Sequence, residues 1–198
     1  MKNEIVAHND LKIRIEEDFF NSVDSNKLLK KFISKLPWES MIIKMFGKDT
    51  KIPRLQCWIG DEGCEYRYSG KQLNRQIWSQ DLIMIRKKIY KELKIDFNSV
   101  LANYYRDGKD SMGWHSDDEK ELGPDPTIAS ISFGSERDLV FRNKITKETI
   151  AIPQTNGCLI LIDGETQKNW QHSIKKTQKV IGPRINLTFR NIINKNNF

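Results

Sequence analysis

Residues 103–119, NYYRDGKDSMGWHSDDE, join the end of a predicted strand to the motif His115-Ser116-Asp117. At the start of a strand, a histidine and a carboxylate two positions apart point to the same side of the backbone. The chain has three histidines, and His172 lies further along in a similar polar and aromatic setting, WQHSI. Two imidazoles and one carboxylate on one side of a metal leave positions open, which suits Fe(II) oxygen chemistry. Taken alone, the H-x-D spacing is more typical of a hydrogen-bonded histidine without a ligand role.

A second informative stretch is RINLTFR, residues 184–190, in which apolar and polar side chains alternate. This period of two predicts a strand that carries Arg184, Asn186, Thr188 and Arg190 on one face. In an ordinary half-exposed strand these side chains lie in water. Two arginines on one face also suit a small dicarboxylate, because a guanidinium binds a carboxylate through two hydrogen bonds.

The residues before the H-x-D motif offer further hydrogen-bonding groups for such an anion. Residues 101–105 alternate as well, which places Asn103 and Tyr105 on one face of a predicted strand. The amide and the phenol are both hydrogen-bond donors. We therefore group them with the arginine-bearing strand as one candidate anion site.

Short β-favouring segments separated by Gly, Asp, Asn and Pro turns occupy the chain from Ser99 onward, which is typical of a sandwich or jelly roll. Two helices are predicted before them, over residues 24–35 with Asp24 or Ser25 as the cap, and over residues 79–93 with Ser79 as the cap. The fold class that follows is mainly β with flanking helices (α+β). The predicted strands are 99–105, 127–133, 138–142, 148–152, 158–162, 170–174 and 184–190.

Residues 41–46 and 54–58 are predicted to pair as strands around GKDTK at 47–51. Phe46 lies near the tip, among several lysines and Arg54. An aromatic side chain on a basic hairpin can enter a base stack while the cations hold phosphates. The alternative is that Phe46 belongs to the core at a strand end.

Composition indicates a globular protein with an anionic partner. The 198 residues, 38% hydrophobic and 30% charged, are enough for one domain with a substantial core. The net charge of +7 and a pI of about 9.2 favour nucleic acid, although a general enrichment in lysine gives the same values. Three cysteines without C-x-x-C spacing, and no long apolar run, predict an intracellular protein with reduced thiols and no membrane span.

Five motifs, in this order along the chain, resemble the AlkB family of Fe(II)- and 2-oxoglutarate-dependent dioxygenases, which repair N-alkylated bases. They are Asn103-x-Tyr105-x-Asp107-Gly108, His115-x-Asp117-Asp118-Glu119, Ser130-x-Ser132-Phe133-Gly134, Trp170-x-His172-Ser173 and Arg184-x-Asn186-Leu187-Thr188-x-Arg190. Upstream the resemblance continues through Met45-Phe46-Gly47-Lys48, Pro53-Arg54-Leu55, Gly60-Asp61 and Tyr66-Arg67-Tyr68-Ser69-Gly70, so it covers roughly residues 40–190.

The resemblance implies a double-stranded β-helix (jelly roll, cupin-like) core over residues 99–190, inside one domain spanning 1–198. Residues 40–76 are expected to form a finger hairpin and a nucleotide-recognition lid. The implied reaction is oxidative demethylation of 1-methyladenine and 3-methylcytosine in DNA. It consumes dioxygen and 2-oxoglutarate and releases formaldehyde and succinate.

The resemblance also implies roles for individual residues. His115, Asp117 and His172 would bind Fe(II), with Arg184 as the first choice for the distal carboxylate of 2-oxoglutarate and Arg190 nearer the metal or Asp117. The other expected cosubstrate contacts are Asn103, Tyr105, Asn186 and Thr188. The expected substrate contacts are Phe46, Gly47, Lys48, Tyr66, Arg67, Tyr68 and Asp118, with Tyr68 stacking on the base and Asp118 accepting from an exocyclic amine.

Several alternatives remain open on the sequence. Tyr68 resembles single-strand-preferring relatives, whereas the finger at Phe46 favours duplex DNA, toward which we lean. RNA is a further substrate of the same enzyme class, and hydroxylation of protein side chains uses the same iron triad. A non-catalytic nucleic-acid-binding module with a structural metal such as zinc is the non-enzymatic alternative. We expect a monomer, cytoplasmic or nuclear.

Overall fold

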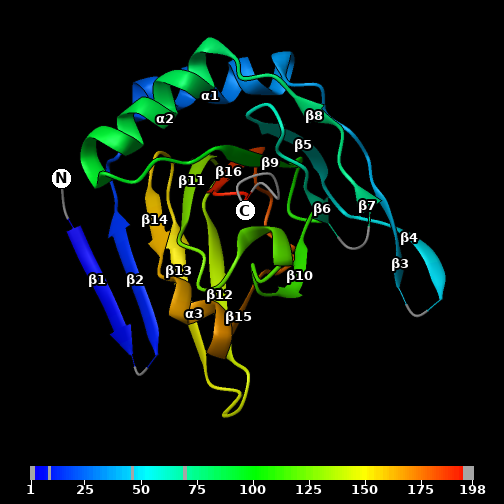
Figure 1. Cartoon of the computed structure of the whole chain (residues 1–198), viewed down its shortest axis with the longest axis vertical. Helices are drawn as coiled ribbons and strands as arrows, with labels where there is room; N and C mark the ends of the chain where they lie inside the picture. Colours follow the sequence, from blue (N-terminus) through cyan, green and yellow to red (C-terminus); the bar gives the residue numbers. More distant parts are fainter. Residues whose placement is uncertain (1–2, 9, 46, 69–70, 194–198) are drawn as a thin grey trace.

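Two facing β-sheets form the centre of the computed structural model, which describes residues 3–8, 10–45, 47–68 and 71–193 (Figure 1). The larger sheet has the order β1 (Asn3–His8), β2 (Leu11–Glu16), β14 (Leu159–Ile162), β11 (Ile128–Gly134), β16 (Arg184–Arg190), β9 (Ser99–Tyr105), β5 (Leu55–Gly60) and β8 (Arg75–Gln76). The smaller sheet has the order β10 (Met112–His115), β15 (Trp170–Ile174), β12 (Arg137–Asn143) and β13 (Thr149–Gln154). A cluster of buried side chains from both sheets fills the space between them, so the predicted jelly-roll class is confirmed.

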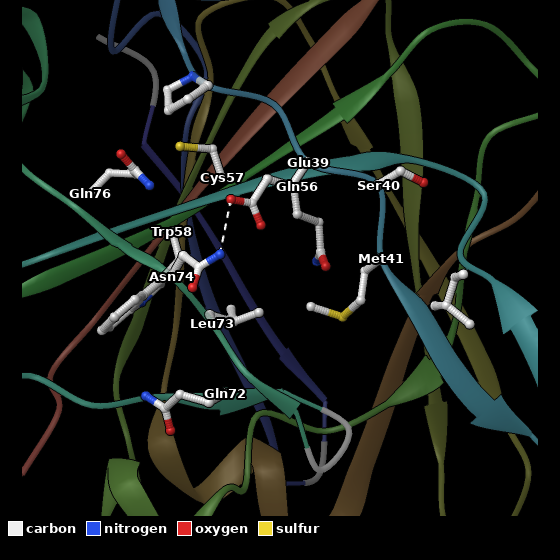
Figure 2. A pocket seen from close by; sticks show the side chains of 12 residues that line it. Glu39, Ser40, Met41, Gln56, Cys57, Trp58, Gln72, Leu73, Asn74 and Gln76 are labelled. Atoms are coloured by element: carbon white, nitrogen blue, oxygen red, sulfur yellow. Dashed lines mark hydrogen bonds between the residues drawn. The ribbon is translucent and has the colours of Figure 1, made fainter.

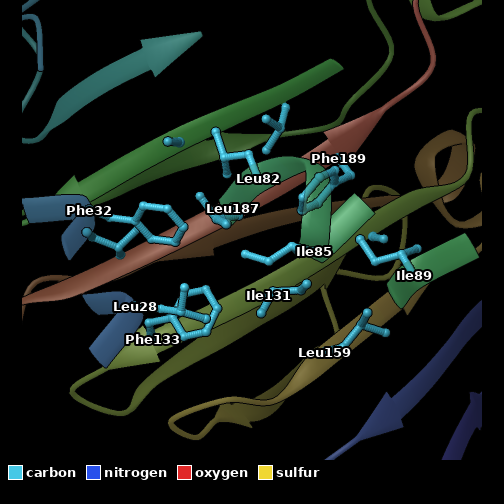
Figure 3. Close-up of a cluster of buried hydrophobic side chains, with 14 of the residues drawn as sticks. Leu28, Phe32, Leu82, Ile85, Ile89, Ile131, Phe133, Leu159, Leu187 and Phe189 are labelled. Atoms are coloured by element: carbon cyan, nitrogen blue, oxygen red, sulfur yellow. The ribbon is translucent and has the colours of Figure 1, made fainter. Parts of the chain in front are cut away.

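Strand alternation gives the larger sheet two different faces. On β16, Leu187 and Phe189 enter an apolar core on the outer face (Figure 3), as does Ile185. The polar residues of the same strand face the smaller sheet. The neighbouring strands continue both rows, because β16 pairs antiparallel with β9 and β11 along its length. Full burial of each large apolar side chain stabilises the fold by about 1.5–3 kcal/mol. The outer core therefore holds rigidly the strands that carry the candidate site.

Helices α1 (Ser22–Lys35) and α2 (Gln80–Leu93) cover the outer face of the larger sheet (Figure 1). Ser79 caps α2 as predicted, with Oγ 3.4 Å from the amide of Leu82. The expected cap of α1 was wrong, because Asn21 accepts from the amide of Asp24 and starts the helix earlier. Two shorter helices, η1 (Lys120–Leu122) and α3 (Gly164–Asn169), complete the described elements; α3 contacts both β2 and β15. No helix in the described part of the chain is long and apolar enough to cross a membrane.

The predicted finger hairpin exists, but its strand pairing differs from the prediction. Strand β3 (Ile42–Met45) pairs with β4 (Lys48–Lys51), and Met45 lies opposite Lys48. The connection is therefore two residues long, and Gly47 adopts φ +76°, which such a tight turn requires. The segment 54–58, expected as the partner, belongs instead to β5 of the larger sheet.

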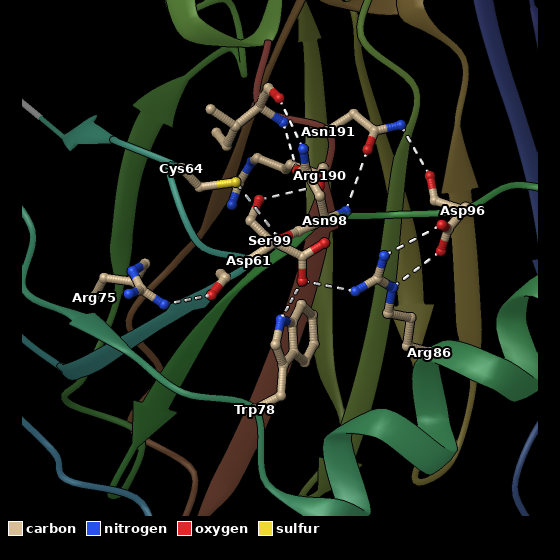
Figure 4. Close-up of polar contacts among 12 residues, drawn as sticks. Asp61, Cys64, Arg75, Trp78, Arg86, Asp96, Asn98, Ser99, Arg190 and Asn191 are labelled. Atoms are coloured by element: carbon tan, nitrogen blue, oxygen red, sulfur yellow. Dashed lines mark hydrogen bonds and ion pairs between the residues drawn. The ribbon is translucent and has the colours of Figure 1, made fainter. Parts of the chain in front are cut away.

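The predicted lid, residues 60–76, contains two-residue strands. Strand β6 (Arg67–Tyr68) pairs with β7 (Lys71–Gln72), and β8 joins the larger sheet in parallel with β5. Figure 4 shows how the start of this segment is held. Asp61 accepts hydrogen bonds from Trp78 Nε1 at 2.7 Å and from Arg86 Nη1 at 2.8 Å. The start of this segment is thus anchored to α2.

The three cysteines, Cys57, Cys64 and Cys158, are all buried free thiols. Burial raises the pKa of Cys57 to about 12 and that of Cys158 to about 11. Such thiols stay protonated and unreactive at neutral pH. This agrees with the predicted reduced state.

Candidate metal and cosubstrate site

Strand pairing brings the two distant histidines together. His115, the last residue of β10, lies directly opposite His172 on β15, and the ring centroids are 4.2 Å apart. Asp117 follows two residues after the strand ends, so the motif closes a strand and does not open one as predicted. One ligand atom from each of the three residues lies within 4.8 Å of the others. The strand register and the H-x-D spacing therefore bring together the three residues expected from the sequence.

Asp117 is buried and held by two partners. Its Oδ1 is 2.5 Å from Arg190 Nη2, and its backbone amide donates to Gln167 Oε1 at 2.9 Å. Burial is the largest single influence and acts to raise the pKa of Asp117, but Arg190 and the two imidazoles together outweigh it and lower that pKa to about 2. The carboxylate is therefore ionised at neutral pH, and the expectation that Arg190 lies beside Asp117 is confirmed.

Both imidazoles are arranged as neutral ligands. His115 Nδ1 is 3.0 Å from the carbonyl oxygen of Gly113, which only accepts, so Nδ1 carries the proton and Nε2 keeps its lone pair. Burial is the main cause that lowers the pKa of His172 to about 3. A neutral imidazole is the form that binds metals.

The donor set fits Fe(II). Asp117 Oδ2 is 3.6 Å from His172 Nε2 and accepts no hydrogen bond from any residue that the structure describes. A buried, ionised oxygen without a donor is costly unless a cation binds it. Two neutral imidazoles and one carboxylate are the ligands of a facial metal site with open positions.

Arg184 provides a second, positively charged end of the same cavity. Its Nη2 donates to Ser132 Oγ at 2.9 Å and to Gln154 Oε1, both uncharged. Nε and Nη1 are buried and have no hydrogen-bond partner among the described residues. Burial lowers the pKa of Arg184, yet a guanidinium in a protein stays charged. A carboxylate is the ligand that would satisfy these buried donors.

Other polar residues line this cavity, together with Tyr105, whose ring centroid is 5.0 Å from the Arg184 guanidinium carbon. Asn186 Nδ2 donates to Ser130 Oγ at 2.8 Å, and Thr188 Oγ1 donates to Asn186 Oδ1 at 2.9 Å. The hydrogen-bonding groups of Asn186 and Thr188 are therefore used mainly by each other and by the neighbouring strand β11. Asn103, opposite Asn186 in register, is fully buried.

The predicted substrate residues are distributed over the lid, the finger and the loop after the metal motif. Tyr66 is buried, with its hydroxyl 2.9 Å from Glu119 Oε1 and its ring 5.9 Å from that of Trp58. Asp118 is exposed and lies 3.9 Å from Lys144 Nζ. Gly47, Lys48 and Arg67 are exposed. Phe46 and the side chain of Tyr68 lie outside the described residues.

Arg54 differs from its predicted role as a basic side chain beside the finger. It is 3% exposed, and its Nε donates to Asn103 Oδ1 at 2.9 Å. The alternation of side chains along β5 and its leading residues turns residues 54 and 56 inward. The contact between Arg54 and Asn103 could not be predicted from the local charge pattern. Arg54 belongs to the interior of the site.

Sequence reasoning missed several polar residues that contact the site. Gln154 and Ser132 bind Arg184, Gln167 binds the Asp117 backbone, and Glu119 binds Tyr66. Ser132 and Glu119 lie inside quoted motifs, which was the available signal. The two glutamines lie on separate elements, and no local pattern marks them.

Comparisons with known proteins agree with this geometry. The family model of the 2OG-Fe(II) oxygenase superfamily matches residues 12–190. The DNA oxidative demethylase ALKBH2 of Homo sapiens is 40% identical over 159 residues, which cover 76% of this chain and 61% of that protein. The alpha-ketoglutarate-dependent dioxygenase alkB homolog 3 of Mus musculus is 34% identical over 183 residues, which cover 88% of this chain and 64% of that protein. The chain therefore spans less than two thirds of either relative.

The fold is also found in solved structures. "The structure of OsALKBH1" matches with a TM-score of 0.63 at 13% sequence identity, covering 90% of this chain and 97% of that one. At this identity the likeness concerns the fold alone. The family model, the relatives and the His–Asp–His set together show that the chain belongs to the 2OG-Fe(II) oxygenase superfamily, and within it to the AlkB family.

Proposed function

We propose that this protein is an Fe(II)- and 2-oxoglutarate-dependent dioxygenase that demethylates N-alkylated bases in DNA. The observation that carries the proposal is the pairing, in one cavity, of the His115–Asp117–His172 set with Arg184. A metal-binding module needs only the first of these. A buried arginine with unpartnered donors beside the three ligands calls in addition for a small acid.

In this proposal His115, Asp117 and His172 hold Fe(II), and Arg184 and Tyr105 bind the distal carboxylate of 2-oxoglutarate. Asn103 donates to the cosubstrate, with Asn186 and Thr188 alongside. Arg190 keeps Asp117 ionised and in place. When bound, Fe(II) and 2-oxoglutarate supply, with dioxygen, the oxidation of the N-methyl carbon that ends in formaldehyde and succinate. The chain itself orients both groups and excludes water from them.

The substrate assignment rests on charge, on the segments around the cavity and on the relatives. A net charge of +7 favours a polyanion. The two relatives named above are a DNA oxidative demethylase and an alkB homolog. Because the methyl group of 1-methyladenine or 3-methylcytosine lies on the pairing edge, the base must leave the duplex to be oxidised. The lid and finger, with Tyr66, Arg67, Tyr68, Phe46, Gly47, Lys48 and Asp118, would receive it.

The remaining parts of the proposal concern strand preference, location in the cell and oligomeric state. Duplex DNA is preferred over single strands because of the finger, and an enzyme that acts on DNA works inside the cell, in the cytoplasm or nucleus. The cavity is lined by residues of one chain, so a monomer is sufficient for the reaction.

The test is anaerobic reconstitution with Fe(II), followed by 2-oxoglutarate, ascorbate, air and oligonucleotides that contain 1-methyladenine. Mass spectrometry follows loss of the methyl group from single- and double-stranded DNA and from RNA. We expect demethylation of DNA that requires both Fe(II) and 2-oxoglutarate. Faster demethylation of RNA than of DNA would make RNA the substrate. Absence of succinate under all conditions would contradict the enzyme class.

A further inference from the structure

The orientation of the Asn103 side chain is set by two neighbouring residues of β5 and its leading segment. Arg54 Nε and Gln56 Nε2 both donate to Asn103 Oδ1, each at 2.9 Å. All three side chains are buried. An asparagine amide has two nearly equal-sized ends, and only hydrogen bonds decide which end points where. Here the oxygen end is bound on the β5 side.

The opposite end of the amide carries the unpaired donors. Asn103 Nδ2 is buried and has no hydrogen-bond partner within the described ranges. Strand alternation places Asn103 on the same face as Tyr105, and pairing places it opposite Asn186, both of which line the cavity. The two unpaired donor hydrogens therefore belong to a residue on the strand face that borders the cavity.

The direction of these two hydrogen bonds is fixed, because a guanidinium can only donate. Arg54 carries only donors, so the atom that faces it must be an acceptor, which is Oδ1 of Asn103. Gln56 must then also present its donor, Nε2, to the same oxygen. Its own Oε1 is left buried and without a hydrogen bond among the described residues. The local hydrogen bonding of Gln56 is thus incomplete, whereas the orientation of Asn103 is doubly held.

Gln56 also borders a groove that is separate from the metal cavity. Figure 2 shows its side chain extending toward Met41 and Leu73, between the segment that leads into the finger and the one that leaves the lid. A side chain that only lined this groove would have no effect on the cosubstrate. The hydrogen bond to Asn103 shows that Gln56 also contacts the residues around the metal cavity and does not only line the groove.

We propose that Gln56 is a positioning residue which, with Arg54, holds the Asn103 amide so that its donor end faces 2-oxoglutarate. The inference rests on the proposed function, because it assumes that the cavity binds this anion. With the amide reversed, Oδ1 would face a carboxylate and repel it. Gln56 therefore contributes to cosubstrate affinity without touching the cosubstrate.

The test measures binding and not turnover. Isothermal titration calorimetry follows 2-oxoglutarate binding to protein loaded with Mn(II), in the absence of oxygen and DNA. Gln56→Met removes the donor with little change in size, and we expect the Kd to rise roughly 2- to 10-fold, the range of one net hydrogen bond. Gln56→Glu places an acceptor against Oδ1 and should raise the Kd further. Gln80→Met, the same change at the exposed start of α2, should leave the Kd unchanged.

A double-mutant cycle separates orientation from general packing. Asn103→Asp keeps an acceptor for Arg54 and Gln56 but has no donor for the cosubstrate, so we expect a large rise in Kd. Adding Gln56→Met to Asn103→Asp should then raise the Kd no further. An equal additional rise in this background would overturn the positioning role. Thermal melts of each variant confirm folding, and Gln56→Glu serves if Gln56→Met does not fold.

The outcomes also separate this inference from the proposed function. If the wild-type protein with Mn(II) binds no 2-oxoglutarate, the proposed enzyme class fails. If wild type binds it and Asn103→Asp binds it equally well, the class stands and the inference about Gln56 is wrong.

Discussion

The proposed chemistry and the proposed substrate contacts lie on differently built parts of the molecule. Arg184, Asn186, Thr188 and Arg190 lie on β16, a seven-residue strand paired along both edges. Strands β6 and β7 of the proposed lid have two residues each and, within the described ranges, form a separate two-stranded sheet. Metal and cosubstrate chemistry requires ligands held in one geometry, which sheet interiors supply. Segments that receive a flipped base are commonly loops on such a scaffold.

This difference predicts that catalysis and nucleic-acid binding can be separated, and the largest effect is expected at the metal ligands. Asp117→Ala should lower turnover by at least about 1,000-fold, because the metal loses a ligand and Arg190 loses its partner. The Kd for an alkylated oligonucleotide should stay unchanged. Asp138→Ala, an exposed carboxylate on β12, is the control. Retained turnover in Asp117→Ala would show that the metal set is misassigned.

The two arginines at the ends of β16 offer a finer comparison within the core. Both are buried, but Arg190 has a carboxylate partner at 2.5 Å, whereas Arg184 contacts uncharged groups. Arg190 completes an ion pair within the protein, whereas Arg184 keeps buried donors for a ligand. Substitution of Arg190 should therefore change stability, and substitution of Arg184 should change cosubstrate binding.

Arg190→Met should mainly reduce stability. It leaves Asp117 as a buried charge without its cation, for which about 3–5 kcal/mol of unfolding free energy is the usual cost. Urea unfolding of the metal-free protein measures the change, and added Mn(II) should restore part of it by neutralising Asp117. A metal-free variant as stable as wild type would contradict the view that this pair supports the fold.

Arg184→Met should mainly reduce cosubstrate affinity. A charge-assisted hydrogen bond contributes about 1.5–3 kcal/mol, so the 2-oxoglutarate concentration at half-maximal rate should rise by roughly 10- to 100-fold. Arg184→Lys should recover only part of this, because an ammonium lacks the planar pair of donors. An unchanged 2-oxoglutarate requirement would place the anion site elsewhere.

The same core predicts how stability depends on pH in the metal-free protein. The pKa of His172 is about 3 in the folded state and 6.5 ordinarily, so below pH 6.5 only the unfolded state takes up this proton. Unfolding free energy should therefore fall as pH falls from 6.5 toward 3, by up to about 1.4 kcal/mol per pH unit. Asp117, with a folded pKa of about 2, adds a loss below pH 3.8. Urea unfolding of wild type and His172→Gln between pH 7.5 and 5 should give a flatter profile for the variant.

Sequence patterns identified the ligands because each signal is local. The spacing His115-x-Asp117 and the alternation through Arg184 and Arg190 depend on two to seven neighbouring residues. Strands 99–105, 170–174 and 184–190 were predicted with the bounds that the structure has. Both faces of these strands are mostly buried, and on β16 the period of two separates an apolar face from a polar one, so no distant contact had to be known.

The features that were missed depend on distant pairing. The buried role of Arg54 comes from contact with Asn103, and the Asp117 amide is bound by Gln167 of α3. The finger was paired with the wrong segment because 54–58 (RLQCW) is more β-favouring than the true partner 48–51 (KDTK). Local propensity therefore ranks the two partners in the wrong order, whereas the tight turn at Gly47 and the pairing of 55–60 within the larger sheet decide between them.

The smallest expected effect lies at the finger, outside the core. Phe46→Ala should lower the rate on duplex DNA by about fivefold, the low end of one aromatic–base stack, because an inserted ring fills the gap left by the flipped base. Single-stranded DNA has no such gap, so its rate should stay the same. Tyr90→Ala, an exposed aromatic on α2, controls for general surface effects. Equal losses on both substrates would mean that Phe46 supports the hairpin and does not enter the stack, and the lean toward duplex DNA would then lose its basis.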